Sequence, residues 1–223
     1  MRQVESLLSE EQWLKLKPLL PQSKASSKGG RPAADNRAVV EGILWILKTG
    51  ARWRDLPPQY PSPSTCWRRL RDWEEQGVWL RVWHSFIAEL DEAHHLEWEE
   101  TFADGSFAPA KKGALEPTLD TMPEKLLNKV QRLILDRGYD SDPLRFRLQE
   151  RGIDMICPHR RNRKKPKTQD GRKLRRYKRR WKVERTFAWF GNYRRLLVRW
   201  EHNLDVYRGF FHLACALIAL KRF

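Results

Sequence analysis

Three short apolar runs in the second half of the chain, each bounded by turn residues, constrain the fold more than any other feature. They cover residues 101–103, 133–135 and 153–157. Runs of this length and composition are typical of strands buried on both faces of a parallel sheet. A helix over Asp142–Gly152, with Pro143 near its first turn, joins the last two runs. The pattern therefore predicts a strand–helix–strand unit and an α/β fold for this part of the chain.

The first 95 residues carry the periodicity of helices instead. Ser9 and Gln12 form a capping-box pattern at the start of one helix. A second helix is capped by Asp35 or Asn36 and is ended by Gly50. We therefore expect an all-α N-terminal domain and a second, α/β domain, with the boundaries 1–95 and 96–223.

A proline-rich turn leads from the second helix to a third and a fourth, expected over residues 66–76 and 78–90. Ser64 or Thr65 is the expected cap of the third helix, and Gly77 its end. That helix sets Trp67, Leu70 and Trp73 on one side and carries basic residues elsewhere, namely Arg68, Arg69 and Arg71. A basic helix after a helix and a turn resembles helix-turn-helix DNA-binding units. A plain helical bundle with a solvated arginine face is the alternative.

The charge balance points to a polyanionic partner. The chain has 44 Lys and Arg residues against 28 Asp and Glu residues, a formal net charge of +16. Such an excess is typical of nucleic-acid-binding proteins and favours nucleic acid as the partner. A membrane partner is not expected, because the longest apolar run, residues 209–220, is shorter than the roughly 20 residues that cross a bilayer. We expect this run to form a buried terminal helix.

The remaining composition indicates a protein of the reducing cytoplasm. The N-terminus lacks the apolar stretch of a signal peptide. Three scattered cysteines, Cys66, Cys157 and Cys215, neither frame disulfides nor have zinc-site spacing.

Two aspartates follow apolar runs directly, Asp104 after the first and Asp136 after the second. Carboxylates at the carboxyl ends of adjacent parallel strands lie where α/β sheets place their sites, and they can share a divalent metal such as Mg²⁺. Each aspartate taken alone is better explained as the cap of a turn.

A third acidic residue favours the metal-site explanation over turn capping. Residues 160–185 are dominated by Lys and Arg, and Glu184 lies among them on an expected amphipathic helix with Val183, Phe187 and Phe190 as its apolar stripe. A lone carboxylate among cations is also explained as an ion-pair partner. Two carboxylates on strands and one on a later basic helix nevertheless form the set that a two-metal nuclease requires.

The segments around these three acids resemble the motifs of a known protein family. The segment from Asp104 to Gly113 resembles the first-aspartate motif of bacterial transposases of the insertion-sequence-four and -five group, and the segment from Asp136 to Ser141 resembles their second-aspartate motif. The family's glutamate segment has Tyr, two residues, Arg, three residues, Glu, six residues and Lys. Tyr177, Arg180 and Glu184 match it, whereas position 191 is Gly, and Arg194 or Arg195 lies one turn further on as a substitute.

The resemblance implies a ribonuclease-H-like domain and cut-and-paste transposition of an insertion element. It implies Asp104, Asp136 and Glu184 as catalytic residues and as ligands of Mg²⁺, with Mn²⁺ able to replace it. Double-stranded DNA, both terminal inverted repeats and target, is the implied partner, and a bacterial cytoplasm with association to the nucleoid is the implied location. The basic and aromatic candidates for DNA contact are Arg68, Arg69, Arg71, Lys164, Lys165, Lys167, Tyr177, Arg180, Arg185, Arg194 and Arg195.

The family pattern is interrupted between the two aspartates. Only 31 residues, positions 105–135, separate them, and residues 111–131 have the pattern of loop and helix rather than of strands. Two strands and a helix of ordinary length need more room. We infer an internal deletion near Gly113-Ala114, and so a truncated ribonuclease-H-like domain that lacks its second and third strands. The first strand would then be an unpaired edge, a template for aggregation or for a homodimer.

Three functions remain open at this level. The first is a metal-dependent transposase whose cleavage is impaired by the deletion. The second is a catalytically inactive DNA-binding remnant that inhibits intact transposase. The third is a nonspecific RNA-binding protein that uses the basic tract, which a charge run alone supports weakly because such runs are usually solvated or disordered.

Overall fold

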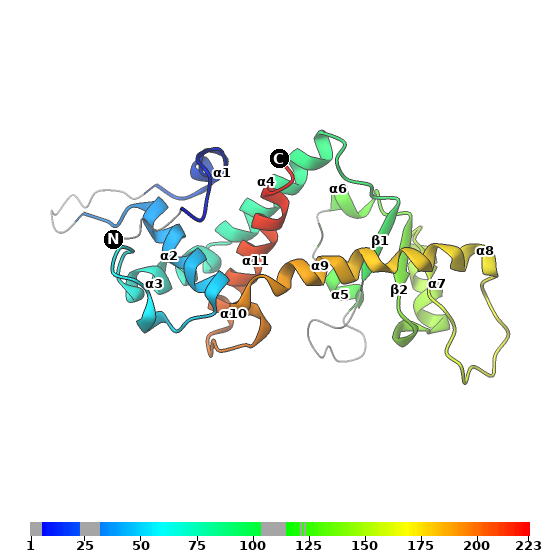
Figure 1. The fold of residues 1–223 in the computed structure, drawn as a ribbon. Helices are drawn as coiled ribbons and strands as arrows, with labels where there is room; N and C mark the ends of the chain where they lie inside the picture. Colours follow the sequence, from blue (N-terminus) through cyan, green and yellow to red (C-terminus); the bar gives the residue numbers. More distant parts are fainter. Residues whose placement is uncertain (1–5, 23–31, 104–114, 121, 123) are drawn as a thin grey trace. The chain divides into compact units, whose positions relative to one another are not determined.

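The computed structural model describes residues 6–22, 32–103, 115–120, 122 and 124–223, and they form two compact units (Figure 1). The first unit combines Met1–His95 with Trp189–Phe223, and the second unit is Leu96–Ala188. A change of unit therefore falls after residue 95. The residues from 189 onward, which the sequence assigns to the α/β domain, pack instead with the N-terminal helices.

The described part of the first unit is helical, as its periodicity predicts. Its elements are α1 (Glu10–Leu16), the 3-10 helix η1 (Lys17–Leu19), α2 (Asn36–Thr49), the 3-10 helix η2 (Trp53–Asp55), α3 (Pro63–Glu75), α4 (Val78–Glu92), the end of α9 (Trp181–Gly191), α10 (Arg194–Leu197) and α11 (Leu204–Leu220). The helix-turn-helix interpretation of α2 and α3 stays a prediction.

The helix ends follow local capping rules. The Ser9 side chain accepts a hydrogen bond from the Gln12 amide, and the Gln12 side chain accepts one from the Ser9 amide, so the predicted capping box is confirmed. Asp35 caps α2 through the amide of Ala38. The predicted start of α3 is wrong. Ser62 is the cap, because Pro63 takes a first-turn position, where the missing N–H is not needed.

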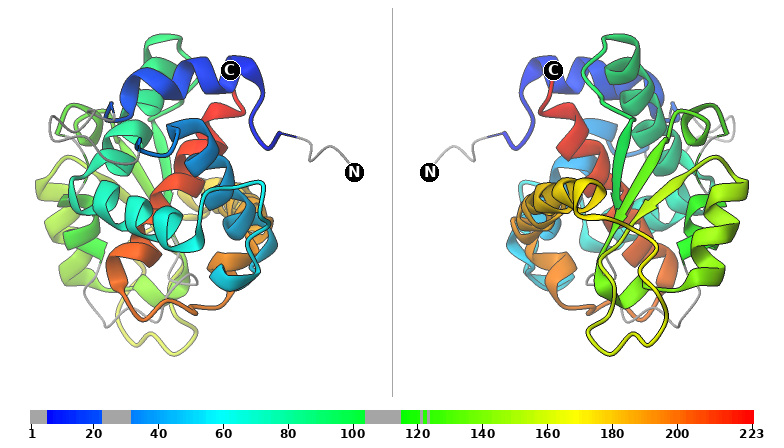
Figure 2. Two further views of the ribbon diagram at one scale, coloured as in Figure 1. Left: turned by 90° about the vertical axis from the view of Figure 1, so that its left-hand side faces the viewer. Right: turned by 90° about the vertical axis from the view of Figure 1, so that its right-hand side faces the viewer.

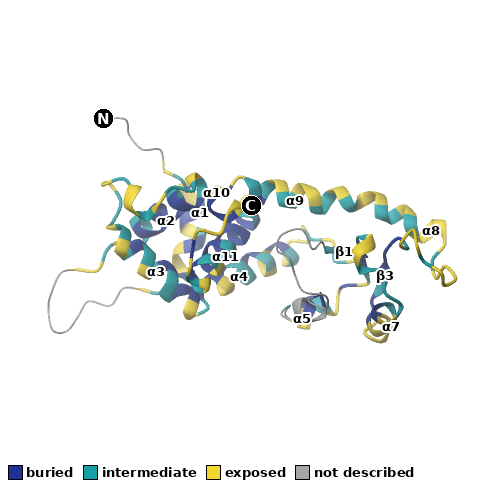
Figure 3. Cartoon of the chain, turned by 90° about the horizontal axis from the view of Figure 1, so that it is seen from below, coloured by how far each residue is buried: buried dark blue, intermediate teal, exposed yellow. Residues whose placement is uncertain are grey.

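Helix α11 supplies much of the core of the first unit. It packs against α3 and α4, and its Phe210 and Leu213 are fully buried. A Cβ added at Gly209 would lie 2.9 Å from Leu70 Cδ1, so the glycine allows the close approach of α11 to α3. The predicted buried terminal helix is thus confirmed, and Figure 3 shows its dark, buried positions. Among the described residues, no helix is both long and apolar enough to cross a membrane.

The second unit contains the α/β part of the chain. Its elements are β1 (Glu100–Ala103), α5 (Leu115–Asp120), α6 (Glu124–Leu127), β2 (Arg132–Leu135), the 3-10 helix η3 (Arg137–Tyr139), α7 (Asp142–Glu150), β3 (Asp154–Ile156), α8 (Gly171–Leu174), the 3-10 helix η4 (Arg175–Arg180) and the first part of α9. All three predicted strands and the helix between the last two are confirmed.

The three strands form one parallel sheet in the order β1-β2-β3, visible in the right-hand view of Figure 2. Phe102 pairs with Ile134, and Ile134 pairs with Ile156. Ala103, at the end of β1, pairs with Leu135, at the end of β2. The sheet is consistent with a ribonuclease-H-like domain.

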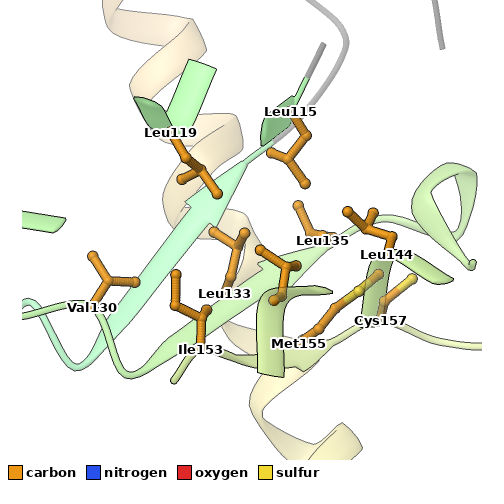
Figure 4. Close-up of a cluster of buried hydrophobic side chains, with 10 residues drawn as sticks. Leu115, Leu119, Val130, Leu133, Leu135, Leu144, Ile153, Met155 and Cys157 are labelled. Atoms are coloured by element: carbon orange, nitrogen blue, oxygen red, sulfur yellow. The ribbon is translucent and has the colours of Figure 1, made fainter. Parts of the chain in front are cut away.

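The two faces of the sheet are covered by different elements. On one face, a cluster of buried side chains joins β2 and β3 to α5 and α7 (Figure 4). It consists of Leu115, Leu119, Val130, Leu133, Leu135, Leu144, Leu148, Ile153, Met155 and Cys157. On the other face η4 packs on β2, and the Lys182 Nζ of α9 lies 6.0 Å from the centre of the Phe102 ring. Strand alternation therefore turns Phe102 and Ile134 toward η4 and α9.

The predicted deletion concerns the segment after β1. Within the described ranges, β1 pairs with β2 alone, and residues 115–120 and 124–127 form the short helices α5 and α6 rather than strands. The junction Gly113-Ala114 lies outside the described residues. The truncation and the exposed edge of β1 therefore stay predictions.

Candidate active site

The carboxylate of Asp136 stands at the carboxyl end of β2. Its backbone is extended, with φ −75° and ψ 170°, and its Oδ1 accepts a hydrogen bond of 3.0 Å from the Gly138 amide, which caps η3. The turn-capping role considered from the sequence is therefore real. It occupies one carboxylate oxygen, and no described residue donates a hydrogen bond to the other. The partly exposed carboxylate thus keeps an oxygen for a cation.

The register of the sheet relates Asp136 to the first predicted aspartate. Ala103 and Leu135 are paired, and they immediately precede Asp104 and Asp136 in the chain. Asp104 itself lies outside the described residues. Because Leu135 belongs to the cluster on the α7 side, alternation along the extended backbone turns Asp136 toward the face covered by η4 and α9.

Glu184, the third predicted acid, lies on α9. It is exposed, and so are Trp181 and Ala188, whereas Val183 and Phe187 are half-buried and Phe190 is buried. The predicted amphipathic helix is confirmed. No described residue forms an ion pair with Glu184. The guanidinium of Arg185 lies instead 4.7 Å from the centre of the Trp181 ring.

The described residues contain no group of three or more His, Cys, Asp or Glu side chains arranged to hold a metal ion. The structure thus does not join Asp136 and Glu184 in such a group, and Asp104 is not among the residues it describes. The donor set is nevertheless the right kind for Mg²⁺, which takes hard carboxylate oxygens and keeps its other positions for water and phosphate.

A second aspartate of the same segment, Asp140, has a different environment. Its side chain is 3% exposed, and its Oδ1 accepts hydrogen bonds of 2.9 Å from Arg145 Nη2 and from His159 Nδ1. Its Oδ2 accepts one of 2.9 Å from the Arg160 amide. Burial raises the pKa of Asp140, but the hydrogen bonds from Arg145, Arg160 and His159 lower it more, so the pKa lies well below its ordinary value. Asp140 is therefore a structural anion.

His159 follows β3 near this site, and both of its ring nitrogens are occupied: Nδ1 by Asp140 and Nε2 by the amide of Thr168 at 3.0 Å. These two contacts leave neither nitrogen available for a phosphate. In the first unit, His212 Nδ1 lies 2.9 Å from Glu74 Oε2.

Cys157 directly follows β3 and lies close to Asp136. Its Sγ donates to the carbonyl oxygen of Asp136 over 3.0 Å, and the side chain is fully buried. Burial raises the pKa of this thiol to about 12, so it is not a nucleophile at neutral pH.

The predicted DNA-contact residues differ in their availability. Six are exposed: Arg68, Lys164, Lys165, Lys167, Arg185 and Arg194. Tyr177 and Arg180 are half-buried and joined by a hydrogen bond of 3.1 Å. Arg69 donates to Asn36 Oδ1, and Arg71 pairs with Asp72 and lies over the Trp67 ring. Both side chains of α3 are thus partly committed within the first unit.

Arg195 does not fit its predicted role. Its side chain is 6% exposed, pairs with Glu201, and donates to the carbonyl oxygens of Gly50 and Ala51. A guanidinium held in this way within the protein cannot reach a phosphate, so Arg195 is a structural residue. Arg194, its exposed neighbour, keeps the predicted role.

Sequence reasoning missed several charged residues of the second unit. Glu100 of β1 binds Arg176 and Arg179 of η4, which fastens η4 to the sheet. Asp140 and Arg145 form the buried pair described above, and Arg163 Nη1 lies 3.7 Å from Asp140 Oδ1. The sequence contains a usable signal for Asp140. The later segment 159–169 has arginines but no acidic residue to balance them, so a nearby acid such as Asp140 is a candidate partner.

Comparison with known proteins also divides the chain between residues 83 and 109, but its second match extends beyond residue 188 into the first structural unit. Residues 8–83 match the family model described as a putative transposase of the IS4/5 family, and residues 109–219 match the model of the transposase DDE domain. No solved structure matches the chain.

Three curated proteins are similar over part of the chain. An uncharacterized 16.2 kDa protein of the insertion element IS402 from Burkholderia cepacia is 42% identical over 104 residues, which cover 45% of this chain and 71% of that protein. The putative transposase for IS402 from the same organism is 40% identical over 92 residues, 41% of this chain and 40% of that protein. The uncharacterized protein y4sN of Sinorhizobium fredii is 31% identical over 91 residues, 41% of this chain and 68% of that protein.

Proposed function

Because this chain belongs to the IS4/5 family of insertion-sequence transposases with a DDE domain, we propose that it binds the terminal inverted repeats of its element and cleaves and joins DNA there. The observation that carries this proposal is the pairing of Ala103 with Leu135, which precede Asp104 and Asp136. Two strands that end side by side, each followed by a carboxylate, provide what a shared divalent metal needs.

Asp104, Asp136 and Glu184 are the proposed ligands of Mg²⁺ or Mn²⁺. When bound there, such ions would supply an activated water and stabilise the leaving oxygen of the phosphodiester. The protein's own contribution is positional. The Gly138 amide holds one oxygen of Asp136 in place, no described residue donates to the other, and Glu100 fixes η4, and with it the start of α9, on the sheet.

Basic side chains supply the second part of the function. Lys164, Lys165, Lys167 and Arg185 of the second unit and Arg68 and Arg194 of the first are exposed. Contacts of such side chains with phosphates fix the register of a protein on DNA without reading the base sequence. The half-buried Arg69 and Arg71 retain donors for the same purpose at the edge of α3.

The second candidate is a DNA-binding remnant without cleavage activity that competes with intact transposase. It is favoured by the three-stranded sheet, in which β1 has one partner among the described strands, and by the short interval between Asp104 and Asp136. A smaller sheet supports the carboxylates less rigidly, so we expect slow cleavage even from the active form. A second copy of the chain, paired along β1, would complete the sheet as a homodimer.

The test is DNA cleavage by the full chain with repeat-end DNA of its element and Mg²⁺ or Mn²⁺. The variant Asp136→Asn keeps the size of the side chain but removes its charge, and we expect it to abolish cleavage while DNA binding persists. Asp154→Asn is the matched control, because Asp154 opens β3 at the opposite end of the sheet and pairs with Lys173. Cleavage that survives in Asp136→Asn would exclude the metal-dependent mechanism. Salt-sensitive binding without any cleavage by the wild-type chain would establish the remnant.

A further inference from the structure

The basic segment after β3 is folded into a closed loop. We name residues 159–168 the cationic loop. It carries Arg160, Arg161, Arg163, Lys164, Lys165 and Lys167 and no acidic residue. A run of this composition is usually solvated and unstructured, because its charges repel one another. Here its two ends meet, so some interaction must offset both the repulsion and the loss of chain entropy.

Two contacts close the base of the loop. His159 Nε2 accepts a hydrogen bond of 3.0 Å from the amide of Thr168, which joins the first residue to the last. The side chain of the next residue, Gln169, donates to the carbonyl oxygen of Met155 and accepts from the amide of Cys157 at 3.4 Å. Gln169 thus binds the outer edge of β3 as a residue of a neighbouring parallel strand would.

The interior of the loop is organised around Arg163. Its guanidinium donates to both carboxylate oxygens of Asp142, at 2.9 and 3.1 Å, and to the carbonyl oxygens of Lys165 and Pro166. The Arg163 side chain is 11% exposed. This inward arginine draws the backbone together, while Lys164, Lys165 and Lys167 remain exposed, with Lys165 Nζ 3.8 Å from Asp142.

The hydrogen bonds also assign the roles of the two ring nitrogens of His159. A backbone amide can only donate, so Nε2 is the acceptor of the Thr168 amide. Nδ1 is then the nitrogen that donates to Asp140 Oδ1, at 2.9 Å. His159 thus connects the buried Asp140 to the far end of the loop.

The loop begins beside the candidate active site. Arg160 donates to the carbonyl oxygens of Arg137, at 3.3 Å, and of Gly138, at 2.6 Å. These two residues directly follow Asp136, and the Gly138 amide is the group that binds the Asp136 carboxylate. Arg160, at the base of the cationic loop, therefore contacts Arg137, the residue that follows the proposed metal ligand Asp136 in the sequence.

Resting on the proposed function, we propose that the cationic loop is a preformed grip for the phosphodiester backbone next to the cleavage site, and that His159 is the positioning residue that keeps it closed. A loop that is ordered before binding loses less conformational entropy on contact with DNA. The three exposed lysines provide the contacts with phosphate, and Asp140, Asp142 and Arg163 hold their backbone in place.

The test compares the salt dependence of DNA binding among variants of the full chain. In the triple variant Lys164→Ala, Lys165→Ala, Lys167→Ala, log affinity is expected to fall less steeply with log salt. The magnitude of this slope should decrease by about 0.9 for each lost phosphate contact, up to about 2.7, and a lower slope means this decrease in magnitude. His159→Asn keeps a donor for Asp140 but cannot reach Thr168, and we expect it to lower the slope by about 1 or more. His159→Gln, whose amide oxygen can replace Nε2, is expected to restore most of the slope. Lys125→Ala, an exposed lysine on α6, is the control with little effect.

Hydrogen exchange of the free protein tests the closure by itself. The Thr168 amide lies at an exposed residue, so its protection must come from His159. We expect this protection to be lost in His159→Asn and kept in His159→Gln. Wild-type slopes in both His159→Asn and the lysine variant, or an unprotected Thr168 amide, would overturn the inference. Lowered slopes together with intact cleavage by Asp136→Asn would leave the grip standing and refute the proposed catalytic function instead.

Discussion

The buried pair of Arg195 and Glu201 gives the sharpest test of the reassignment of Arg195. Their side chains are 6% and 8% exposed, and Glu201 also accepts a hydrogen bond of 3.2 Å from the indole of Trp53. Arg195 in turn donates to the carbonyl oxygens of Gly50 and Ala51, which follow α2. The guanidinium of Arg195 thus links α10 to the end of α2 and balances the negative charge of Glu201.

The substitution Arg195→Met removes the cation and leaves Glu201 as a buried charge without its partner. Breaking a buried ion pair in this way costs about 3–5 kcal/mol of unfolding free energy. For a chain of this size, that corresponds to a fall in Tm of roughly 6–20 °C. The double variant Arg195→Met, Glu201→Leu removes both charges, and we expect it to recover most of the loss, since apolar replacements of buried pairs are often neutral.

Calorimetric unfolding of the wild-type chain, the two single variants and the double variant forms a double-mutant cycle. The matched measurement is the salt slope of DNA binding, which the structure predicts to be unchanged in Arg195→Met at temperatures where it is folded. A loss of stability below about 1 kcal/mol, combined with a lower salt slope, would restore Arg195 to the DNA-binding surface and refute its structural role.

Two further predictions concern Asp140 and Gly50. Because the pKa of Asp140 is lowered in the folded state, its ion pairs stabilise the protein above the ordinary carboxyl pKa of about 4, and this stability is lost as the pH falls below it. Asp140→Asn is therefore expected to lower the unfolding free energy at pH 7, and its difference from wild type should shrink progressively as the pH falls below about 4, whereas a difference that does not change with pH would contradict this. Gly50 ends α2 with φ +72°, and an added Cβ would lie 3.0 Å from Arg194 Cβ. Gly50→Ala should cost about 1–2 kcal/mol in chemical denaturation, with Gly191→Ala, which meets no atom within 4 Å, as the control.

The fold was predictable wherever one local pattern decides the structure. The apolar runs at 133–135 and 153–157 have the composition of buried parallel strands, and the structure places both in the sheet. The start of α3 was missed because Ser62, Ser64 and Thr65 all carry hydroxyl groups suited to a cap. The position of Pro63 decides among them, since proline fits the first turn of a helix.

The candidate site was less predictable, because charged residues act through partners far away in the sequence. Arg195 and Arg194 are adjacent arginines in the sequence, yet only the first faces Glu201 and the end of α2. His159 looks available until Asp140 and Thr168 are brought to its two nitrogens. The sequence shows that basic residues cluster in these segments, whereas the tertiary structure decides which of their side chains remain exposed.

The two acids of the segment Asp136–Asp140 show how the proposed DNA binding and the proposed cleavage could be separated. Among the described residues, donors reach one oxygen of Asp136 and both oxygens of Asp140. Asp140 orders the cationic loop through His159 and Arg160, and none of these contacts passes through Glu184. On the proposed function, a change that disabled the metal ligands but not Asp140 would therefore leave the loop in place. Such a chain would keep its hold on DNA while losing cleavage, which is the property that an inhibitory remnant requires.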